Sequence, residues 1–136
     1  MILVAVDGTD TSLRAGSYVG GLVRGRAVRV VCLFVYTERV VSSPSTAALG
    51  LAERQDQEAI AGELRAELHS RAAEIGLEAE FVERHGDAFA EIVRLADELR
   101  VDAVVVGASR SLGHRIVGAV GTRLVRCGRW PMTVVP

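Results

Sequence analysis

The chain has 136 residues, of which 49% are hydrophobic and 24% are charged, and its formal net charge is −1. This length suits one folded domain, and this share of apolar residues excludes a disordered chain. A net charge near zero argues against a general binder of nucleic acid or of anionic membranes, because both need a basic excess. We therefore expect a single globular domain over residues 1–136.

The N-terminal third begins with an apolar strand and a polar turn. Residues Ile2–Val6 form a continuous run rich in β-branched side chains, which predicts a parallel strand buried on both faces. Residues 7–12 supply a turn and several candidates for a helix N-cap. We expect a helix next, then a second apolar strand over residues 27–35 and a surface loop over residues 36–46. The expected helix carries four large apolar residues and stops near Gly25: Leu13, Val19, Leu22 and Val23.

The middle third contains a long helical pattern, a strand and a shorter helix. Apolar residues recur at steps of three and four over residues 47–75, which predicts a helix whose many Glu and Arg residues form a solvated face. Residues 77–83 alternate apolar and polar, which is typical of a strand at a sheet edge. Residues 84–87 are expected to form a turn, with Asp87 as the N-cap of a helix over residues 88–99.

The last third carries the most informative stretch. The apolar run of residues 103–106 stops at Gly107, and a loop with further glycines follows. A helical pattern then runs over about residues 120–128, before a final strand, Met132–Val135. A strand, a glycine loop and a helix in this order can place backbone N–H groups and a helix N-terminus around an anion. The same order also occurs in ordinary βα turns.

Strands and helices alternate along the whole chain, which predicts an open parallel sheet with helices on both faces. In such sheets ligands bind beyond the carboxyl ends of the strands, where the strand order reverses. The first and fourth expected strands end in polar or glycine loops, at Asp7 and at Gly107. If these strands are neighbours, the two loops face each other across one crevice.

The cysteines and histidines show no pattern of a metal or catalytic site. Cys32 and Cys127 fall in expected core elements, so we expect both to be buried and reduced, which suits a cytoplasmic protein. His69, His85 and His114 lie in different elements without ligand spacing. No nucleophile–base pair or carboxylate dyad is visible, and we expect neither catalysis nor a bound metal.

Four segments follow one another in the order and spacing of a known family. They are residues 2–9 (Ile-Leu-Val-Ala-Val-Asp-Gly-Thr), 85–88 (His-Gly-Asp-Ala), 102–110 (Asp-Ala-Val-Val-Val-Gly-Ala-Ser-Arg) and 130–135 (Trp-Pro-Met-Thr-Val-Val). Over nearly its whole length the chain resembles the universal stress protein (UspA-like) family, with Ala88 where that family has proline. The resemblance implies an α/β fold like that of the adenine nucleotide alpha hydrolases. Its single open five-stranded parallel sheet would have the order 3-2-1-4-5, with helices on both faces, and the protein would commonly be a homodimer.

One branch of this family binds ATP through a loop with the pattern Gly-x2-Gly-x9-Gly-Ser/Thr, and another branch lacks the pattern and does not bind ATP. Here Gly107 matches the first glycine, but Arg110 stands at the second. The third falls on Gly118-Ala119 if the following helix keeps its usual length, or on Gly121-Thr122 if the hydroxyl is matched instead. We prefer the first alignment, because packing fixes helix length while loop length varies. Its alanine lacks the hydroxyl that contacts phosphate.

The resemblance implies a site for an adenine nucleotide, ATP or AMP. Asp7 corresponds to the aspartate beside adenine and ribose, but it also fits an Asx-type N-cap of the first helix. Val35 corresponds to an adenine contact, but it also fits an ordinary core position. Arg110 could meet phosphate through its guanidinium, or be a solvated loop residue. The predicted nucleotide-binding residues are Asp7, Val35, Gly107, Ser109, Arg110, Gly118, Ala119 and Val120.

Two functions stay open at this point. The first is a regulatory domain that binds an adenine nucleotide between the Asp7 and Gly107 loops. The second is an interaction module of the same fold that does not bind ATP and acts through dimerisation or a regulatory protein partner. Gly107 and the basic loop after it favour the first, whereas Arg110 and Ala119 at motif positions favour the second. We favour nucleotide binding, and a hydrolase of small nucleotides is the least favoured alternative.

The final strand, Met132–Val135, would be a sheet edge in the 3-2-1-4-5 order. A bare edge presents unpaired N–H and C=O groups, and Pro136 adds no N–H. Pairing with a second copy about a two-fold axis would satisfy these groups. We therefore expect a homodimer through Met132–Val135, with Thr133 presenting one side of the edge. A monomer with a hydrated edge is the alternative.

Overall fold

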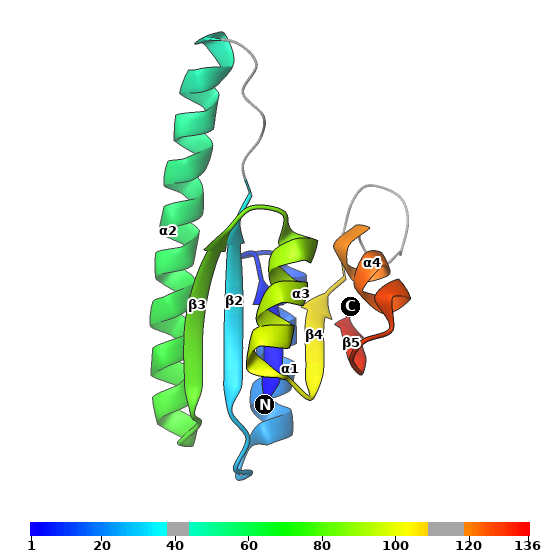
Figure 1. Ribbon diagram of the computed structural model, residues 1–136. Coiled ribbons are helices and arrows are strands. Elements are labelled where there is room, and N and C mark those ends of the chain that lie inside the picture. Colours follow the sequence, from blue (N-terminus) through cyan, green and yellow to red (C-terminus); the bar gives the residue numbers. More distant parts are fainter. Residues whose placement is uncertain (38–43, 109–118) are drawn as a thin grey trace.

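The computed structural model describes residues 1–37, 44–108 and 119–136 (Figure 1). Its strands form one parallel sheet in the order β3-β2-β1-β4-β5. The fold class and the strand order expected above are therefore confirmed. The elements in chain order are β1 (Ile2–Val6), α1 (Asp10–Val23), β2 (Val30–Tyr36), α2 (Pro44–Ile75), β3 (Ala79–His85), α3 (Ala88–Leu99), β4 (Ala103–Gly107), α4 (Ala119–Cys127) and β5 (Met132–Val135).

Helices cover both faces of the sheet, and each pair of helices packs on its own part of the core. On one face, α1 and α2 pack on alternate residues of the central strands, including Val4 and Cys32. On the other face, α3 and α4 pack on the intervening residues, including Leu3 and Val31. The central strands are therefore apolar on both sides, which explains their uninterrupted β-branched runs.

Helix α1 presents a different face to the sheet than its leucines suggested. Its sheet-facing residues are Ala15, Val19 and Val23, which recur every four positions and are buried. Leu13 and Leu22, the two leucines of this helix, are 37% and 43% exposed. They fall beside the buried stripe rather than on it, because the helical period places them on its flanks.

Helix α2 begins at Pro44, earlier than expected, and only its C-terminal half is packed. Ala61 and Leu64 are buried, whereas Leu51 is 64% exposed. Figure 1 shows the N-terminal half of α2 projecting beyond the ends of the strands. Within the part of the chain that the structure describes, no helix is both long and apolar enough to cross a membrane.

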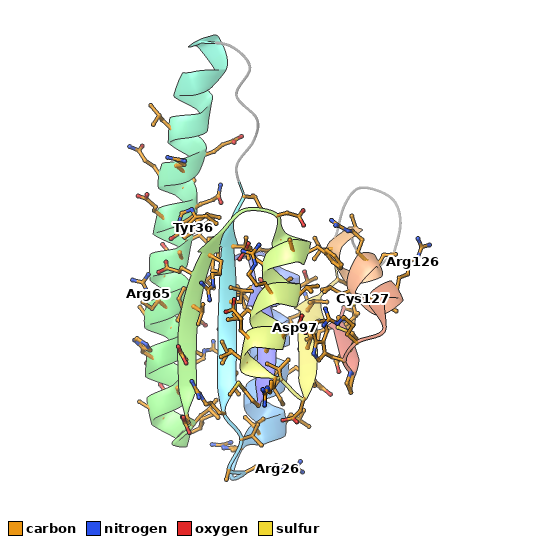
Figure 2. The ribbon with its side chains drawn as sticks, in the orientation of Figure 1. Arg26, Tyr36, Arg65, Asp97, Arg126 and Cys127 are labelled. Carbon is orange, nitrogen blue, oxygen red and sulfur yellow. The ribbon has the colours of Figure 1, made fainter. Side chains whose placement is uncertain are left out.

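Strand β3 is a sheet edge, as the alternating pattern indicated, but it continues through His85 instead of turning at residue 84. The extension pairs His85 with Tyr36 of β2, and the two rings stack with centroids 4.6 Å apart. The Tyr36 hydroxyl donates to Glu83 Oε1 at 2.8 Å, and Arg65 of α2 donates to Glu83 Oε2 at 2.5 Å (Figure 2). Burial and the Glu83 carboxylate raise the pKa of Tyr36 to about 12.

The outer edge of β5 is formed by different residues than expected. Val104 N donates to Pro131 O at 3.0 Å, and Ala108 N donates to Val135 O at 2.8 Å. Because backbone groups alternate in direction along a strand, Thr133 also turns its N–H and C=O toward β4. The outward groups therefore belong to Met132 and Val134, which corrects the assignment of the edge to Thr133.

The end of β4 lies directly against the backbone of the first turn of α1. A Cβ atom added to Gly107 would lie 2.5 Å from the carbonyl carbon of Thr11 and 2.6 Å from the backbone nitrogen of Ser12. No side chain fits there, so this position requires glycine for close approach rather than for backbone freedom.

We predict that Gly107→Ala lowers the free energy of unfolding by about 1–3 kcal/mol, because the added methyl group forces two backbone segments apart. The matched control is Gly62→Ala, at an exposed position of α2 where an added Cβ meets nothing within 4 Å. That change should raise stability by up to about 1 kcal/mol through helix propensity. Urea denaturation measures both, and an unchanged midpoint for Gly107→Ala would contradict the close approach.

The two cysteines differ in environment. Cys32 is 6% exposed on β2, and burial raises the pKa of its thiol to about 12. Cys127 lies at the end of α4, only half-buried, with Sγ 3.0 Å from the carbonyl oxygen of Leu124 (Figure 2). Both thiols are free. The expectation of burial is confirmed for Cys32 and wrong for Cys127, which is the last residue of the short helix α4.

We predict that a thiol reagent at pH 8 labels Cys127 in the native protein and leaves Cys32 unmodified. A thiol with a pKa near 12 has roughly one thiolate in ten thousand molecules at that pH, and the thiolate is the reactive form. In the Cys127→Ser variant, mass spectrometry should detect labelling of Cys32 only after the protein is unfolded in denaturant. Rapid native labelling of that variant would show that Cys32 is accessible.

Candidate functional site

A cavity of about 710 Å³ opens at the carboxyl edge of the sheet, and we call it the carboxyl-edge cavity. Its volume lies within the range of roughly 300–1,000 Å³ that is usual for small-molecule sites. Strand β1 lies between β2 and β4. The chain adds β2 and β3 on one side of β1 and then β4 and β5 on the other, so the strand order reverses at β1. The cavity therefore occupies the position where ligands bind in open α/β sheets.

Most of the predicted site residues line this cavity, although they come from four different segments of the chain. Those that do are Asp7, Val35, Gly107, Ala119 and Val120. The remaining predicted residues lie outside the described part of the chain: Ser109, Arg110 and Gly118.

Asp7 sits at the rim, immediately after β1, and is exposed. Its Oδ1 accepts hydrogen bonds from Thr9 N at 3.0 Å and from Thr9 Oγ1 at 2.6 Å. Thr9, not Asp7, is the N-cap of α1, and its hydroxyl oxygen accepts from Ser12 N at 3.3 Å. Asp7 therefore orients the capping residue through one oxygen, and Oδ2 makes no hydrogen bond to any described residue.

The loop that carries Asp7 is pressed against helix α2. Gly8 has φ +81°, a conformation that residues with side chains rarely adopt. A Cβ atom there would lie 2.5 Å from Cγ2 of Ile60. Two independent constraints thus favour glycine directly after Asp7.

The floor of the cavity is apolar and its walls are mixed. Leu33, Val106 and Ile92 form part of the floor, between the sheet and α3. Val35 is half-buried at the end of β2, where it packs against the α3 side of the core and also lines the cavity. An apolar floor with a polar rim suits a flat ring system that carries polar groups at its edge.

Gln57 of α2 is a cavity residue that the sequence analysis missed. Its Oε1 accepts from Thr37 N at 3.0 Å, and its Nε2 donates to Thr37 O at 3.2 Å. The side chain therefore ties α2 to the end of β2 through both backbone groups of one residue. A signal was present, because Gln57 precedes Ile60, Ala61 and Leu64 at helical spacing and is polar on an otherwise apolar stripe.

The opposite wall comes from the N-terminal end of the described part of α4. Ala119, Val120 and Gly121 line the cavity there, and Gly121 is buried. The N-terminal end of a helix attracts anions, because the helix dipole is positive at that end.

Among residues 1–37, 44–108 and 119–136, no group of three or more His, Cys, Asp or Glu side chains could hold a metal ion. The described part of the cavity instead offers hydroxyl, carboxylate and amide groups around an apolar floor. Its polar residues are Asp7, Thr9, Asp10, Thr11, Ser12, Thr37 and Gln57.

Comparison with known proteins assigns the chain to a family. Residues 1–136 match the Universal stress protein family. The chain is 27% identical over 143 residues to Universal stress protein YxiE of Bacillus subtilis (strain 168), an alignment that covers 98% of this chain and 97% of that protein.

Two of the solved structures that share the fold have a bound nucleotide. One is a universal stress protein in complex with cAMP, with a TM-score of 0.73, 24% identity and coverage of 99% of this chain and 95% of that one. The other is a universal stress protein family protein from Arabidopsis thaliana with AMP bound, with a TM-score of 0.71, 22% identity and coverage of 98% and 89%. Because the family match spans every residue and the sheet has the strand order that the resemblance implied, this chain belongs to the universal stress protein family.

Proposed function

We propose that this protein is a regulatory domain that binds an adenine nucleotide, ATP or AMP, in the carboxyl-edge cavity. One observation carries the proposal: residues from four separate segments, among them Asp7, Gly107 and Ala119, line a single cavity at the reversal point of the sheet. The cAMP and AMP held by the two solved structures of the same fold support an adenine nucleotide as the ligand.

The described residues of the cavity offer chemically suitable groups for each part of the proposed ligand. The apolar floor beside Val35 suits the adenine ring, since stacking it there removes apolar surface from water. Asp7 Oδ2, which accepts no hydrogen bond from the described residues, is an acceptor for a ribose hydroxyl or an amino group. The N-terminal end of the described part of α4, where Ala119 and Val120 line the cavity, suits phosphate through the helix dipole.

The second candidate is an interaction module that binds no ATP and acts through dimerisation or a regulatory protein partner. It is favoured by Ala119, because an alanine at the start of α4 offers phosphate no hydroxyl. For both candidate functions we propose that the protein lies in the cytoplasm and catalyses no reaction. We also propose that it binds neither nucleic acid nor a membrane. The two free cysteines support that compartment.

We predict that calorimetry detects AMP and ATP binding with Kd values below the millimolar range, and that Asp7→Asn weakens it roughly five- to fifteen-fold, about 1–1.5 kcal/mol. Asparagine keeps an oxygen for the two bonds to Thr9 but replaces the free acceptor with a donor. The control is Asp97→Asn, which removes a carboxylate that pairs with Arg129 (Figure 2). Asp97 lies near the C-terminal end of α3, whereas the cavity lies at the N-terminal end of that helix. No binding heat at millimolar nucleotide would favour the interaction module.

We also propose a homodimer in which the β5 edges of two copies pair. The change to test is Val134→Pro, because it removes an outward N–H while leaving the groups that bond to β4. Wild type should sediment as a dimer at micromolar concentration and the variant as a monomer with an unchanged circular dichroism spectrum. Val134→Ala, which keeps the N–H, should stay dimeric. A monomeric wild type would exclude pairing through this edge.

A further inference from the structure

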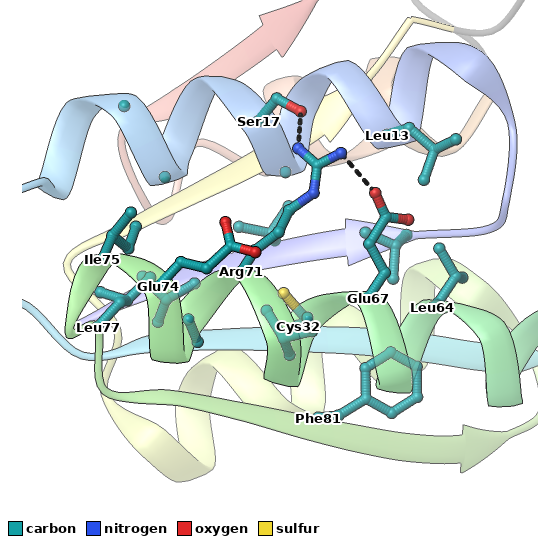
Figure 3. Close-up of a pocket in the computed structure, with 18 of the residues that line it drawn as sticks. Leu13, Ser17, Cys32, Leu64, Glu67, Arg71, Glu74, Ile75, Leu77 and Phe81 are labelled. Atoms are coloured by element: carbon teal, nitrogen blue, oxygen red, sulfur yellow. Dashed lines mark hydrogen bonds and ion pairs between the residues drawn. The ribbon is translucent and has the colours of Figure 1, made fainter.

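A second cavity, of about 280 Å³, lies between α1, α2 and the sheet, and we call it the inter-helix cavity (Figure 3). It shares only the edge residues Val6 and Ser12 with the carboxyl-edge cavity. Its lining is mostly apolar. The side chains that form its floor and flanks include Val4, Val30, Cys32, Leu64, Leu68 and Phe81.

The cavity exists in part because α1 presents three glycines where it faces α2. Gly16, Gly20 and Gly21 line it, and a Cβ atom added to any of them would meet nothing within 4 Å. The glycines are therefore not required by close packing, and each weakens the helix by about 1 kcal/mol relative to alanine. The buried residues of α1 contact the sheet instead, so the space toward α2 stays open.

A polar bridge spans the mouth of this cavity instead of a packed helix–helix contact. Arg71 of α2 donates to Ser17 Oγ of α1 at 3.4 Å and pairs with Glu67 at 2.7 Å (Figure 3). Arg24 and Glu74 also line the mouth. Two guanidinium groups and two carboxylates balance, so the mouth favours neither an anion nor a cation.

We propose that the inter-helix cavity is a binding site for a small uncharged apolar molecule, such as an aromatic ring or a short alkyl chain. An engineered apolar cavity of about 150 Å³ stays dry and takes up benzene, so 280 Å³ suits roughly ten to twelve heavy atoms. The driving force is removal of apolar surface from water on both partners. This site uses residues other than those of the proposed nucleotide site, and it stands independently of that proposal.

The test uses 4-phenylbutanol as the neutral probe and 4-phenylbutyrate as an anion of similar size. NMR titration of wild type should give saturable shifts of the Leu64 and Leu68 methyl groups with the alcohol, with a Kd below the millimolar range. The acid should bind at least five-fold more weakly. Absence of saturable shifts at these methyl groups would overturn the site, and tighter binding of the acid would overturn its neutral chemistry.

Filling the cavity provides the second arm. Gly20→Leu should weaken binding of 4-phenylbutanol at least ten-fold, because its side chain enters the open space. Gly62→Leu is the matched control, since it makes the same change at an exposed helical glycine outside the cavity, and it should bind like wild type. If Gly20→Leu does not fold, Gly16→Leu makes the same test. Equal affinity in a folded filled variant and in the control would overturn the proposal.

Discussion

The contact between the end of β4 and the first turn of α1 is the constraint on which the rest of the site depends. Gly107 lets the two backbones approach more closely than any side chain would permit. Since α1 starts directly after the Asp7 turn, this contact holds that turn beside the C-terminal end of β4. If these two backbones moved apart, the carboxyl-edge cavity would widen between the Asp7 turn and the end of β4, where predicted site residues lie.

The helices pack differently on the two faces of the sheet. On the α3 and α4 side, Ile92, Leu95 and Leu124 pack closely on the central strands and leave the sheet covered. On the other side, α1 contacts mainly β4 and β1, whereas α2 contacts β3 and β2. The space between α1 and α2 is spanned by Arg71 and not by apolar side chains. Each face therefore combines a packed core with a cavity: the carboxyl-edge cavity beside α3 and the inter-helix cavity between α1 and α2.

Local signals that repeat along the chain were sufficient to predict the elements and the parallel sheet, whereas the strand order came from the family resemblance. Apolar runs, helical periods and capping residues such as Asp87, whose Oδ1 accepts from Ala90 N at 2.9 Å, each specify an element without knowledge of its neighbours. Features that depend on tertiary neighbours were less predictable. The bond from Gln57 to Thr37 and the exposure of Leu13 and Cys127 depend on where α2, α1 and α4 settle on the sheet. The strand direction of Thr133 depends on register, which a single strand does not encode.

The projecting half of α2 has a consequence for motion. Residues 50–56 form a helix beyond the sheet, with Leu51 largely in water, whereas the buried Ala61, Leu64 and Ala72 anchor the same helix further along. An isolated helical segment of this length is marginal in water, and its order is propagated from the anchored turns. Backbone amide protons along α2 should therefore exchange with solvent in a gradient, fast at residue 50 and slow beyond residue 61. A single continuous helix then contains both a locally melting segment and part of the most slowly opening core.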